Sequence, residues 1–301
     1  MQQVIAELQE AGVGDIMLDA PMAPYTTWEI GGPADVLLIP QTKEQLVGAV
    51  KLLYRHQTPW FVLGRGSNLL VADKGIRGVV IKLGPALDYA RFDGNLVHAG
   101  GAHSFIVLAV KASKQGLTGL EYAGGIPGSV GGAVYMNAGA HGSDVSRILK
   151  QAEVMLNTGE LVTMTKEDLQ YAYRHSVLHR LPGVVTEAVF ELGQGDRKEI
   201  AGTFATYKDR RIQTQPLHLP CAGSVFRNPE GHFAAKLIEE AGLKGTRIGG
   251  AEVSTQHANF MINTGQATAN DILALMGHVQ ERVQEKFGVK LVPEVLKVGE
   301  F

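Results

Sequence analysis

Cysteine is nearly absent from this chain of 301 residues, which carries a single one, Cys221. One thiol excludes a disulfide framework and any Cys-x-x-Cys metal site, and we expect Cys221 to pack as a small apolar side chain. The N-terminus lacks a cationic segment followed by an apolar core, so we expect no signal peptide. No apolar run approaches the roughly 18–20 residues of a membrane span. These absences predict a cytoplasmic protein with no membrane partner.

An excess of charge of one sign is also missing. The 28 Lys and Arg side chains nearly balance the 30 Asp and Glu side chains, which gives a net charge of −2. So small a net charge creates no strong field that would attract nucleic acid. The ten histidines show no His-Glu-x-x-His motif and no metal-ligand spacing. We therefore expect no metal site and no nucleic-acid partner.

Two nucleotide-binding motifs are incomplete or missing. The turn Gly64-Arg65-Gly66-Ser67-Asn68 follows an apolar run, but Leu69 stands where the dinucleotide fingerprint has its third glycine. No Gly-Lys-Ser/Thr sequence is present, which excludes a Walker P-loop. What remains is a turn whose backbone amides and two polar side chains can hold a pyrophosphate. A plain tight turn between a strand and the next element is the alternative.

Glycine is concentrated in one stretch, with eight glycines among the 24 residues 119–142. Each glycine costs roughly 0.5–1 kcal/mol inside a helix or strand, so we expect irregular backbone that presses close to a ligand. Amides that follow Pro127 can point at a phosphate from the start of a helix. The alternative is a cluster of tight turns between buried strands. The candidate cofactor-binding residues of the two loops are Gly64, Arg65, Gly66, Ser67, Asn68, Leu69, Gly124, Gly125, Ile126, Pro127, Gly128, Ser129 and Gly132.

Hydrophobic periodicity predicts a mixed α+β fold in two or three domains. The predicted strands are Ala34–Ile39, Trp60–Leu63, Gly78–Lys82, Tyr89–Phe92, Leu96–Ala99, Leu149–Leu156, Leu161–Thr165, Val184–Leu192, Phe260–Asn263 and Leu291–Val298. The predicted helices are a short N-terminal one, one that follows a Thr42–Gln45 capping box, Ser104–Gln115, Arg197–Arg211, Ala234–Ala241, and a long one between Thr268 and Gly288. Two prolines and no periodicity mark Gln213–Pro220 as a linker.

Three side chains are candidates for catalysis or binding. Arg174 can clamp a carboxylate with its planar fork, although most arginines are surface ion-pair partners. Ser224 follows a glycine outside any Gly-x-Ser-x-Gly elbow, so it can donate a proton without being a nucleophile. Glu294 lies in an apolar run, and burial would raise its pKa and make it an acid. A turn serine and a water-facing glutamate are the alternatives.

Seven segments resemble the UDP-N-acetylenolpyruvoylglucosamine reductase family, in the same order along the chain. They are Thr26–Asp35, Gly64–Val71, Ala123–Ala140, Tyr173–Ser176, Ala222–Pro229, Leu237–Ser254 and Pro293–Val295. The family's longer branch has an extra Tyr-bearing loop over the substrate, which has no counterpart here. The chain therefore resembles the short, type II branch.

The resemblance implies three domains. Residues 1–82, with a strand at 293–301 that returns to them, and residues 83–212 would form a FAD site of the vanillyl-alcohol-oxidase type. Residues 213–292 would bind the UDP-sugar. The implied reaction is the NADPH-dependent reduction of UDP-N-acetylglucosamine enolpyruvate to UDP-N-acetylmuramate, in peptidoglycan precursor synthesis.

The family's catalytic residues fall on three positions of this sequence. Arg174 takes the place of the catalytic Arg, Ser224 that of the proton donor, and Glu294 that of the Glu that activates the carboxyl group. The expected substrate contacts are Tyr173, Asn228, Gln256 and His257. We expect a monomer. An oxidase of small alcohols or sugars with the same cofactor fold, and a nucleotide-binding module without catalysis, are the alternatives.

Overall fold

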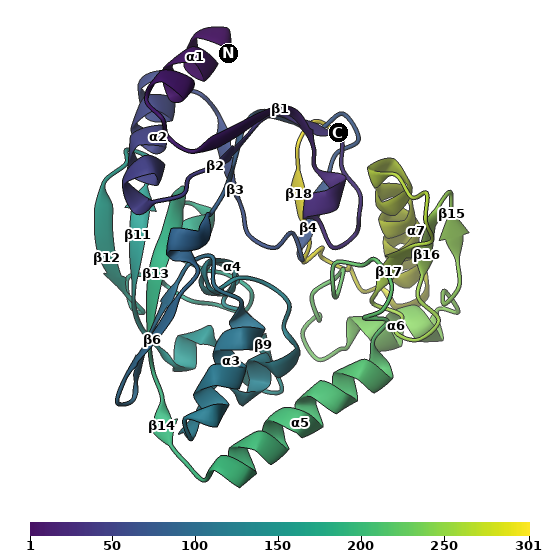
Figure 1. Ribbon diagram of the computed structural model, residues 1–301. Coiled ribbons are helices and arrows are strands. Elements are labelled where there is room, and N and C mark those ends of the chain that lie inside the picture. The colour runs from purple at the N-terminus through teal and green to yellow at the C-terminus, as the bar shows by residue number, and fades with distance from the viewer. The chain divides into compact units, whose positions relative to one another are not determined.

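The computed structural model describes residues 1–301 as a mixture of helices and strands, so the predicted α+β class is confirmed (Figure 1). The helices are α1 Gln2–Glu10, α2 Lys43–Arg55, α3 Phe105–Lys114, α4 Val130–Met136, α5 Arg197–Thr214, α6 Ala234–Glu240 and α7 Ala269–Phe287. No helix combines the length and the apolar character needed to cross a membrane.

The strands are mostly short. They are β1 Asp15–Pro21, β2 Pro33–Ile39, β3 Trp60–Leu63, β4 Leu69–Val71, β5 Ile76–Lys82, β6 Ala90–Asp93, β7 Leu96–Gly100, β8 Leu117–Thr118, β9 Gly139–Ala140, β10 Ser143–Asp144, β11 Leu149–Leu156, β12 Leu161–Thr165, β13 Gly183–Glu191, β14 Gly193–Gln194, β15 Arg247–Ile248, β16 Ala251–Val253, β17 Met261–Asn263 and β18 Leu296–Val298.

The chain forms two compact units, each built from three segments. Unit 1 comprises Met1–Leu18, Val36–Arg65 and Gly78–Arg210, and unit 2 comprises Asp19–Asp35, Gly66–Arg77 and Arg211–Phe301. The division passes through the Gly64–Asn68 turn, between Arg65 and Gly66. The three-domain division drawn from the sequence is a finer one and stays a prediction.

Unit 1 has two separate hydrophobic cores. In the first, α2 buries its predicted face, with Leu46, Val50 and Leu53 inaccessible to solvent, against a sheet in the order β1-β2-β5-β3. Strands β3 and β5 run parallel within that sheet. The predicted capping box at the start of α2 is present, since Gln45 N donates to Thr42 Oγ1 at 3.2 Å.

The second core of unit 1 lies on an antiparallel sheet in the order β12-β11-β13-β7-β6. Apolar side chains of this sheet and of α3 and α4 are fully buried together, Phe105 and Phe190 among them. Strands β6 and β12 alternate in burial along their length, whereas β11 and β13 also bury neighbouring residues, Met155 and Val184 in the first core and Val154 and Val185 in the second.

One expectation for the glycine-rich stretch is wrong, because part of it is helical. Helix α4 contains Gly131 and Gly132. A side chain at Gly131 would bring a Cβ within 3.1 Å of the Gly101 carbonyl oxygen and 3.4 Å of the Val185 carbonyl oxygen. The tight contact with the Gly101 carbonyl oxygen favours glycine at this position, and this packing outweighs the low helix propensity of glycine.

Unit 2 packs α6 and α7 around a sheet in the order β15-β16-β17. The predicted stripe on α7 is confirmed, since Ile272, Leu275 and Val279 are fully buried. Strand β18 pairs in parallel with β4. The predicted strand Leu291–Val298 is split, because Pro293 forms an isolated bridge with Phe226 and only β18 pairs as a strand.

The predicted linker Gln213–Pro220 begins too early. Helix α5 continues through Thr214, so only the part after it is irregular.

Candidate active site

Arg174 lies in a tight two-residue turn of unit 1. The amide of Ala172 donates to the His175 carbonyl oxygen at 3.0 Å, and the His175 amide donates back to the Ala172 carbonyl oxygen at 3.1 Å. Arg174 has φ of +54°, a left-handed conformation that is uncommon for a residue with a side chain. Strained backbone of this kind is concentrated at functional sites, where the surrounding structure holds it in place.

The Arg174 turn is fixed to the end of the glycine-rich stretch by three hydrogen bonds. Arg174 Nη2 donates to the Gly139 carbonyl oxygen at 2.7 Å, and Ser176 Oγ donates to the Tyr135 carbonyl oxygen at 2.7 Å. Asn137 Nδ2 donates to the Ala172 carbonyl oxygen at 3.0 Å. The end of the glycine-rich stretch and the Arg174 turn, which lie about 35 positions apart in the sequence, are therefore held together in the fold.

Tyr173 and Arg174 present their side chains at the tip of this turn. The Tyr173 side chain is exposed, and the guanidinium carbon of Arg174 lies 5.0 Å from the centre of its ring. Such a cation–π contact orients the guanidinium without neutralising its charge. The Gly139 carbonyl oxygen and the Tyr173 ring thus both contribute to placing the guanidinium.

Ser224 and Glu294 lie on neighbouring segments of unit 2. The Glu294 amide donates to the Val225 carbonyl oxygen at 2.7 Å, and Phe226 and Pro293 form an isolated bridge. Both Ser224 and Glu294 are half-buried. The structure thus brings together a predicted hydroxyl and a predicted acid that are 70 positions apart in the sequence.

The segment that carries Ser224 is held by a buried amide side chain. Asn259 Oδ1 accepts from the Phe226 amide at 3.0 Å, and Asn259 Nδ2 donates to the Phe226 carbonyl oxygen at 2.8 Å. In addition, the Val225 amide donates to the Asn259 carbonyl oxygen at 2.8 Å. These bonds fix the backbone directly after Ser224.

The second half of the Gly64–Asn68 turn lies beside Glu294 in unit 2. Asn68 Nδ2 donates to the Glu294 carbonyl oxygen at 3.3 Å, and the Leu296 amide donates to the Asn68 carbonyl oxygen at 3.0 Å. Leu69 is buried in β4. Within unit 2 the predicted cofactor turn, the predicted hydroxyl and the predicted acid are therefore neighbours. Arg174 belongs to unit 1.

The two predicted phosphate-binding loops meet within unit 1. A Cβ added at Gly64 would lie 2.8 Å from Ser129 Oγ. The amides that begin α4 already have protein partners, because Val130 N donates to the His103 carbonyl oxygen and Gly132 N donates to Ser129 Oγ. From Val130 onward the amides of this loop are therefore bonded to the protein, and only the amides between Pro127 and Val130 are left to face a phosphate.

Three of the predicted cofactor-binding residues at this contact have amides that fit a diphosphate. The amides of Arg65, Gly128 and Ser129 make no hydrogen bond to the protein. Gly128 has φ of +142°, a backbone conformation that favours glycine. Unbonded amides on tightly turned backbone form the concave nests that hold phosphate oxygens.

Several glycines of the stretch are explained by protein packing alone. A Cβ at Gly124 would lie 2.7 Å from the Phe204 ring, and one at Gly139 would lie 2.5 Å from the Ser143 carbonyl oxygen. Gly125 and Ile126 are half-buried, and Pro127 is exposed. Close approach to a ligand is therefore needed at only part of this stretch.

The predicted substrate contacts in unit 2 have structural partners. The exposed Asn228 accepts through Oδ1 from the Ala234 amide, at the start of α6, and exposed Gln256 donates through Nε2 to the Gln213 carbonyl oxygen at 3.0 Å. His257 is half-buried beside Phe260. Burial lowers the pKa of His257, and the nearby Lys244 charge lowers it further.

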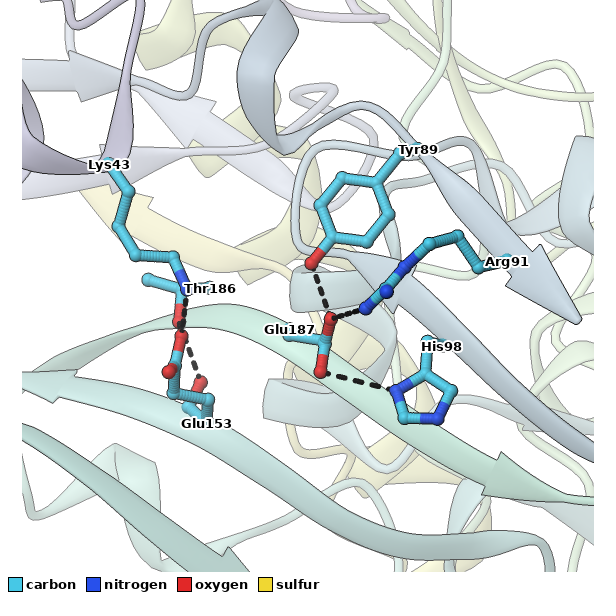
Figure 2. A network of polar contacts seen from close by, with 7 residues as sticks. All are labelled: Lys43, Tyr89, Arg91, His98, Glu153, Thr186 and Glu187. Atoms are coloured by element: carbon cyan, nitrogen blue, oxygen red, sulfur yellow. Dashed lines mark hydrogen bonds and ion pairs between the residues drawn. The ribbon is translucent and has the colours of Figure 1, made fainter. Parts of the chain in front are cut away.

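A polar network that the sequence did not indicate lies on the five-stranded sheet of unit 1 (Figure 2). Glu187 accepts from Tyr89 at 2.5 Å, contacts Arg91 at 3.3 Å, and lies 3.4 Å from His98 Nδ1. Burial alone would raise the pKa of the Glu187 carboxyl, but the bonds from Tyr89 and His98 outweigh it, so this pKa lies below its usual value. Burial raises the pKa of Tyr89, and its bond to Glu187 raises it further.

Glu153, directly opposite Glu187 on β11, continues this network. It accepts from Lys43 at 2.5 Å and from Thr186 Oγ1 at 2.5 Å. Each of the two carboxylates thus has a cationic and a hydroxyl partner within the protein. The network therefore stabilises unit 1 and is not a candidate binding site. No group of three or more His, Cys, Asp or Glu side chains is placed to hold a metal ion.

Two family models match the chain. The one described as "FAD binding domain" matches residues 34–165. The one described as "UDP-N-acetylenolpyruvoylglucosamine reductase, C-terminal domain" matches residues 215–298. The first covers both loops with unbonded amides, and the second covers the Ser224 and Glu294 segments.

Relatives with the same description match along the whole chain. UDP-N-acetylenolpyruvoylglucosamine reductase of Bacillus licheniformis is 49% identical over 301 residues, which are 100% of this chain and 99% of that protein. UDP-N-acetylenolpyruvoylglucosamine reductase 1 of Bacillus anthracis is 49% identical over 300 residues, 99% of this chain and 100% of that protein. The crystal structure of the reductase from Thermus caldophilus superposes with a TM-score of 0.81 at 36% identity, covering 94% of this chain and 98% of that one.

Proposed function

The chain belongs to the UDP-N-acetylenolpyruvoylglucosamine reductase family and is an FAD-dependent oxidoreductase, and from this premise we propose that Arg174, Ser224 and Glu294 carry its reaction. The enzyme reduces UDP-N-acetylglucosamine enolpyruvate to UDP-N-acetylmuramate with NADPH as the reductant, in peptidoglycan precursor synthesis. The observation that supports the assignment best is the pairing of the Ser224 and Glu294 segments beside Asn68 of the cofactor turn.

The cofactor-binding residues we propose are those whose backbone amides have no protein partner. In unit 1 these are Arg65, Gly128 and Ser129, which would donate to the diphosphate of FAD. When bound, FAD takes a hydride from NADPH and delivers it to the terminal vinyl carbon of the enolpyruvyl group. The protein's own contribution is to orient the substrate and to match the charge that develops on it.

Arg174 would hold the substrate carboxylate in its guanidinium fork. Addition of hydride to the vinyl carbon pushes negative charge through the neighbouring carbon onto that carboxylate, which already carries one charge. A fixed cation stabilises this second charge without having to reorganise. The rigid turn around Arg174 suits this task, because its backbone is held by bonds on both sides.

Ser224 and Glu294 would complete the reaction. The Ser224 hydroxyl donates a proton to the carbon next to the carboxylate, so that one hydride and one proton have been added across the double bond, and solvent returns a proton to Ser224. Glu294, whose segment is paired with that of Ser224, would be the third of these side chains beside the carboxylate.

The remaining assignments concern substrate contacts and organisation. We propose that Tyr173, Asn228, Gln256 and His257 contact the UDP-sugar. Gln256 donates through its amide nitrogen to α5 already, so its oxygen would face the substrate. We also propose a monomer in the cytoplasm, with cofactor-binding domains at 1–82 and 83–212, a substrate domain at 213–292, and residues 293–301 returning to the first. Light scattering of the purified protein tests the monomer.

Ser224→Ala tests the proposed mechanism. The bound flavin should be reduced by NADPH at the wild-type rate, whereas its reoxidation by the enolpyruvyl sugar nucleotide should slow by roughly 10²- to 10⁴-fold, the usual contribution of a general acid. Anaerobic stopped-flow absorbance measures both half-reactions. Normal rates in both halves would remove Ser224 from the mechanism, and rapid reoxidation by O₂ without substrate would instead favour an oxidase.

A further inference from the structure

We propose that Asn137 is a positioning residue, which holds the Arg174 turn where its guanidinium meets the substrate carboxylate. This inference rests on the role proposed for Arg174. Asn137 is 3% exposed, directly follows α4, and has φ of +45°. Its side chain therefore has one fixed direction, set by a left-handed backbone and close packing.

Both ends of the Asn137 amide are bonded to backbone. Its Nδ2 donates to the Ala172 carbonyl oxygen at 3.0 Å, and its Oδ1 accepts from the Ser146 amide at 3.0 Å. The bond from Ser146 fixes the orientation of the Asn137 amide group, and the bond to Ala172 ties the turn to that fixed group. An amide side chain can make both bonds because it carries a donor and an acceptor.

The bonded carbonyl belongs to the closing pair of the turn. Ala172 accepts from the His175 amide at 3.1 Å as well as from Asn137, so the residue that closes the turn is held from two directions. Arg174, inside the turn, is left-handed at φ of +54° and would relax if its flanks were released.

A role as a helix cap does not account for these contacts. Asparagine tolerates the left-handed position after a helix, but glycine serves that position equally well. The bond to Ala172 spans 35 positions of sequence and contributes nothing to capping α4. What the asparagine side chain adds beyond a cap is the connection to the Arg174 turn.

Three variants separate these contributions. Asn137→Asp keeps the acceptor for Ser146 and removes the donor to Ala172, and Asn137→Gly keeps the left-handed backbone and removes both bonds. The matched control is Asn263→Asp in unit 2. Asn263 is 6% exposed, donates to the Trp28 carbonyl oxygen at 3.0 Å and accepts from the Gly265 amide at 2.8 Å.

The half-reactions and hydrogen exchange give the readouts. We expect Asn137→Asp and Asn137→Gly to leave flavin reduction by NADPH within about twofold and to slow reoxidation by the enolpyruvyl sugar nucleotide on the order of 10- to 100-fold, as for a misplaced positioning group. Amide exchange in residues 170–178 should accelerate in both variants and not in Asn263→Asp. In an Arg174→Ala background, Asn137→Asp should slow reoxidation little further, because the two residues act as one.

Three results would overturn the inference. One is an Asn137→Asp variant whose half-reactions and exchange match those of Asn263→Asp. Another is a double variant, Asn137→Asp/Arg174→Ala, whose flavin reoxidation is slowed by the product of the two single effects, because residues that act independently combine in this way. The third is an Arg174→Ala variant with normal reoxidation, which also overturns the proposed role of Arg174. The first two leave that role intact. If Asn137→Asp does not fold, Asn137→Gly carries the same comparison.

Discussion

The contact between Gly64 and Ser129 gives a sharp test of how the two cofactor loops meet. An alanine Cβ at position 64 would lie 2.8 Å from Ser129 Oγ, whereas ordinary contact begins near 3.4 Å, so about 0.6 Å of separation is missing. Ser129 Oγ cannot move away freely, because it caps α4 by accepting from the Gly132 amide at 3.2 Å. Such overpacking costs about 1–3 kcal/mol of folding free energy.

The second half of the test removes the clashing atom. Ser129→Ala loses the cap, at a cost of about 1 kcal/mol. The double variant Gly64→Ala/Ser129→Ala has room for the new methyl group, because the Ser129 Cβ lies 3.8 Å away. Its free energy of unfolding should therefore resemble that of Ser129→Ala alone, about 1–3 kcal/mol better than the sum of the two single changes.

Urea unfolding of the four proteins measures this coupling, and titration of the apoproteins with FAD measures its effect on the cofactor. Gly64→Ala should weaken FAD binding, since it pushes apart the two loops that carry the Arg65 and Ser129 amides, and Ser129→Ala should largely restore the binding. Strictly additive free energies would mean that the loops do not touch, and the reasoning about the diphosphate site would fail with that contact.

Two further predictions concern stability. Because the folded state lowers the pKa of Glu187 below its usual 4.5, its carboxylate stabilises the fold above about that pH and loses this effect as the pH falls through the lowered value. Glu187→Gln should therefore reduce the free energy of unfolding in urea most near pH 7, and progressively less as the pH falls below 4.5; an equal loss throughout would contradict the assignment. Gly131→Ala should destabilise unit 1 by about 1–3 kcal/mol, since its Cβ meets two carbonyl oxygens, whereas Gly277→Ala in α7, with nothing within 4 Å, should stabilise unit 2 by up to about 1 kcal/mol. Equal shifts in thermal midpoint for the two alanines would refute the packing argument.

Periodicity predicted the regular elements well where one face is buried. Strands Trp60–Leu63, Leu149–Leu156 and Leu161–Thr165 have the predicted bounds, and α7 has the predicted start and stop. These segments repeat their apolar residues with the period of the element, so the local pattern and the fold agree. The cap residues Thr268 and Gly288 fixed the ends of α7.

The glycine-rich stretch shows where local reasoning stops. The low helix propensity of Gly131 argues against α4, and only the neighbouring Gly101 and Val185 carbonyl oxygens explain why a side chain is excluded there. Burial by a distant strand cannot be read from a single window of sequence. The same limit applies to β18, which depends on a partner more than 200 positions away.

The candidate site residues were inferred one by one from the sequence, but the contacts that hold them in place were not. Motifs indicated Arg174, Ser224 and Glu294, whereas nothing in the sequence placed Asn137 under one of them. A weak signal existed, because an asparagine directly after an apolar run and before Ala-Gly is typical of a left-handed helix end. The bond to Ala172 joins residues 35 positions apart, and the sequence around Asn137 does not indicate it.

The pairing of β4 with β18 has a consequence for synthesis on the ribosome. Asn68, next to β4, contacts a residue 226 positions further along, so at roughly 5–20 residues per second the ribosome needs roughly 10–45 s to make the second partner. Throughout that interval Leu69, Leu70 and Val71, all buried in the finished protein, lack the strand with which they pair. A pause in translation between the two strands would lengthen the time for which this apolar segment is unpaired and open to aggregation.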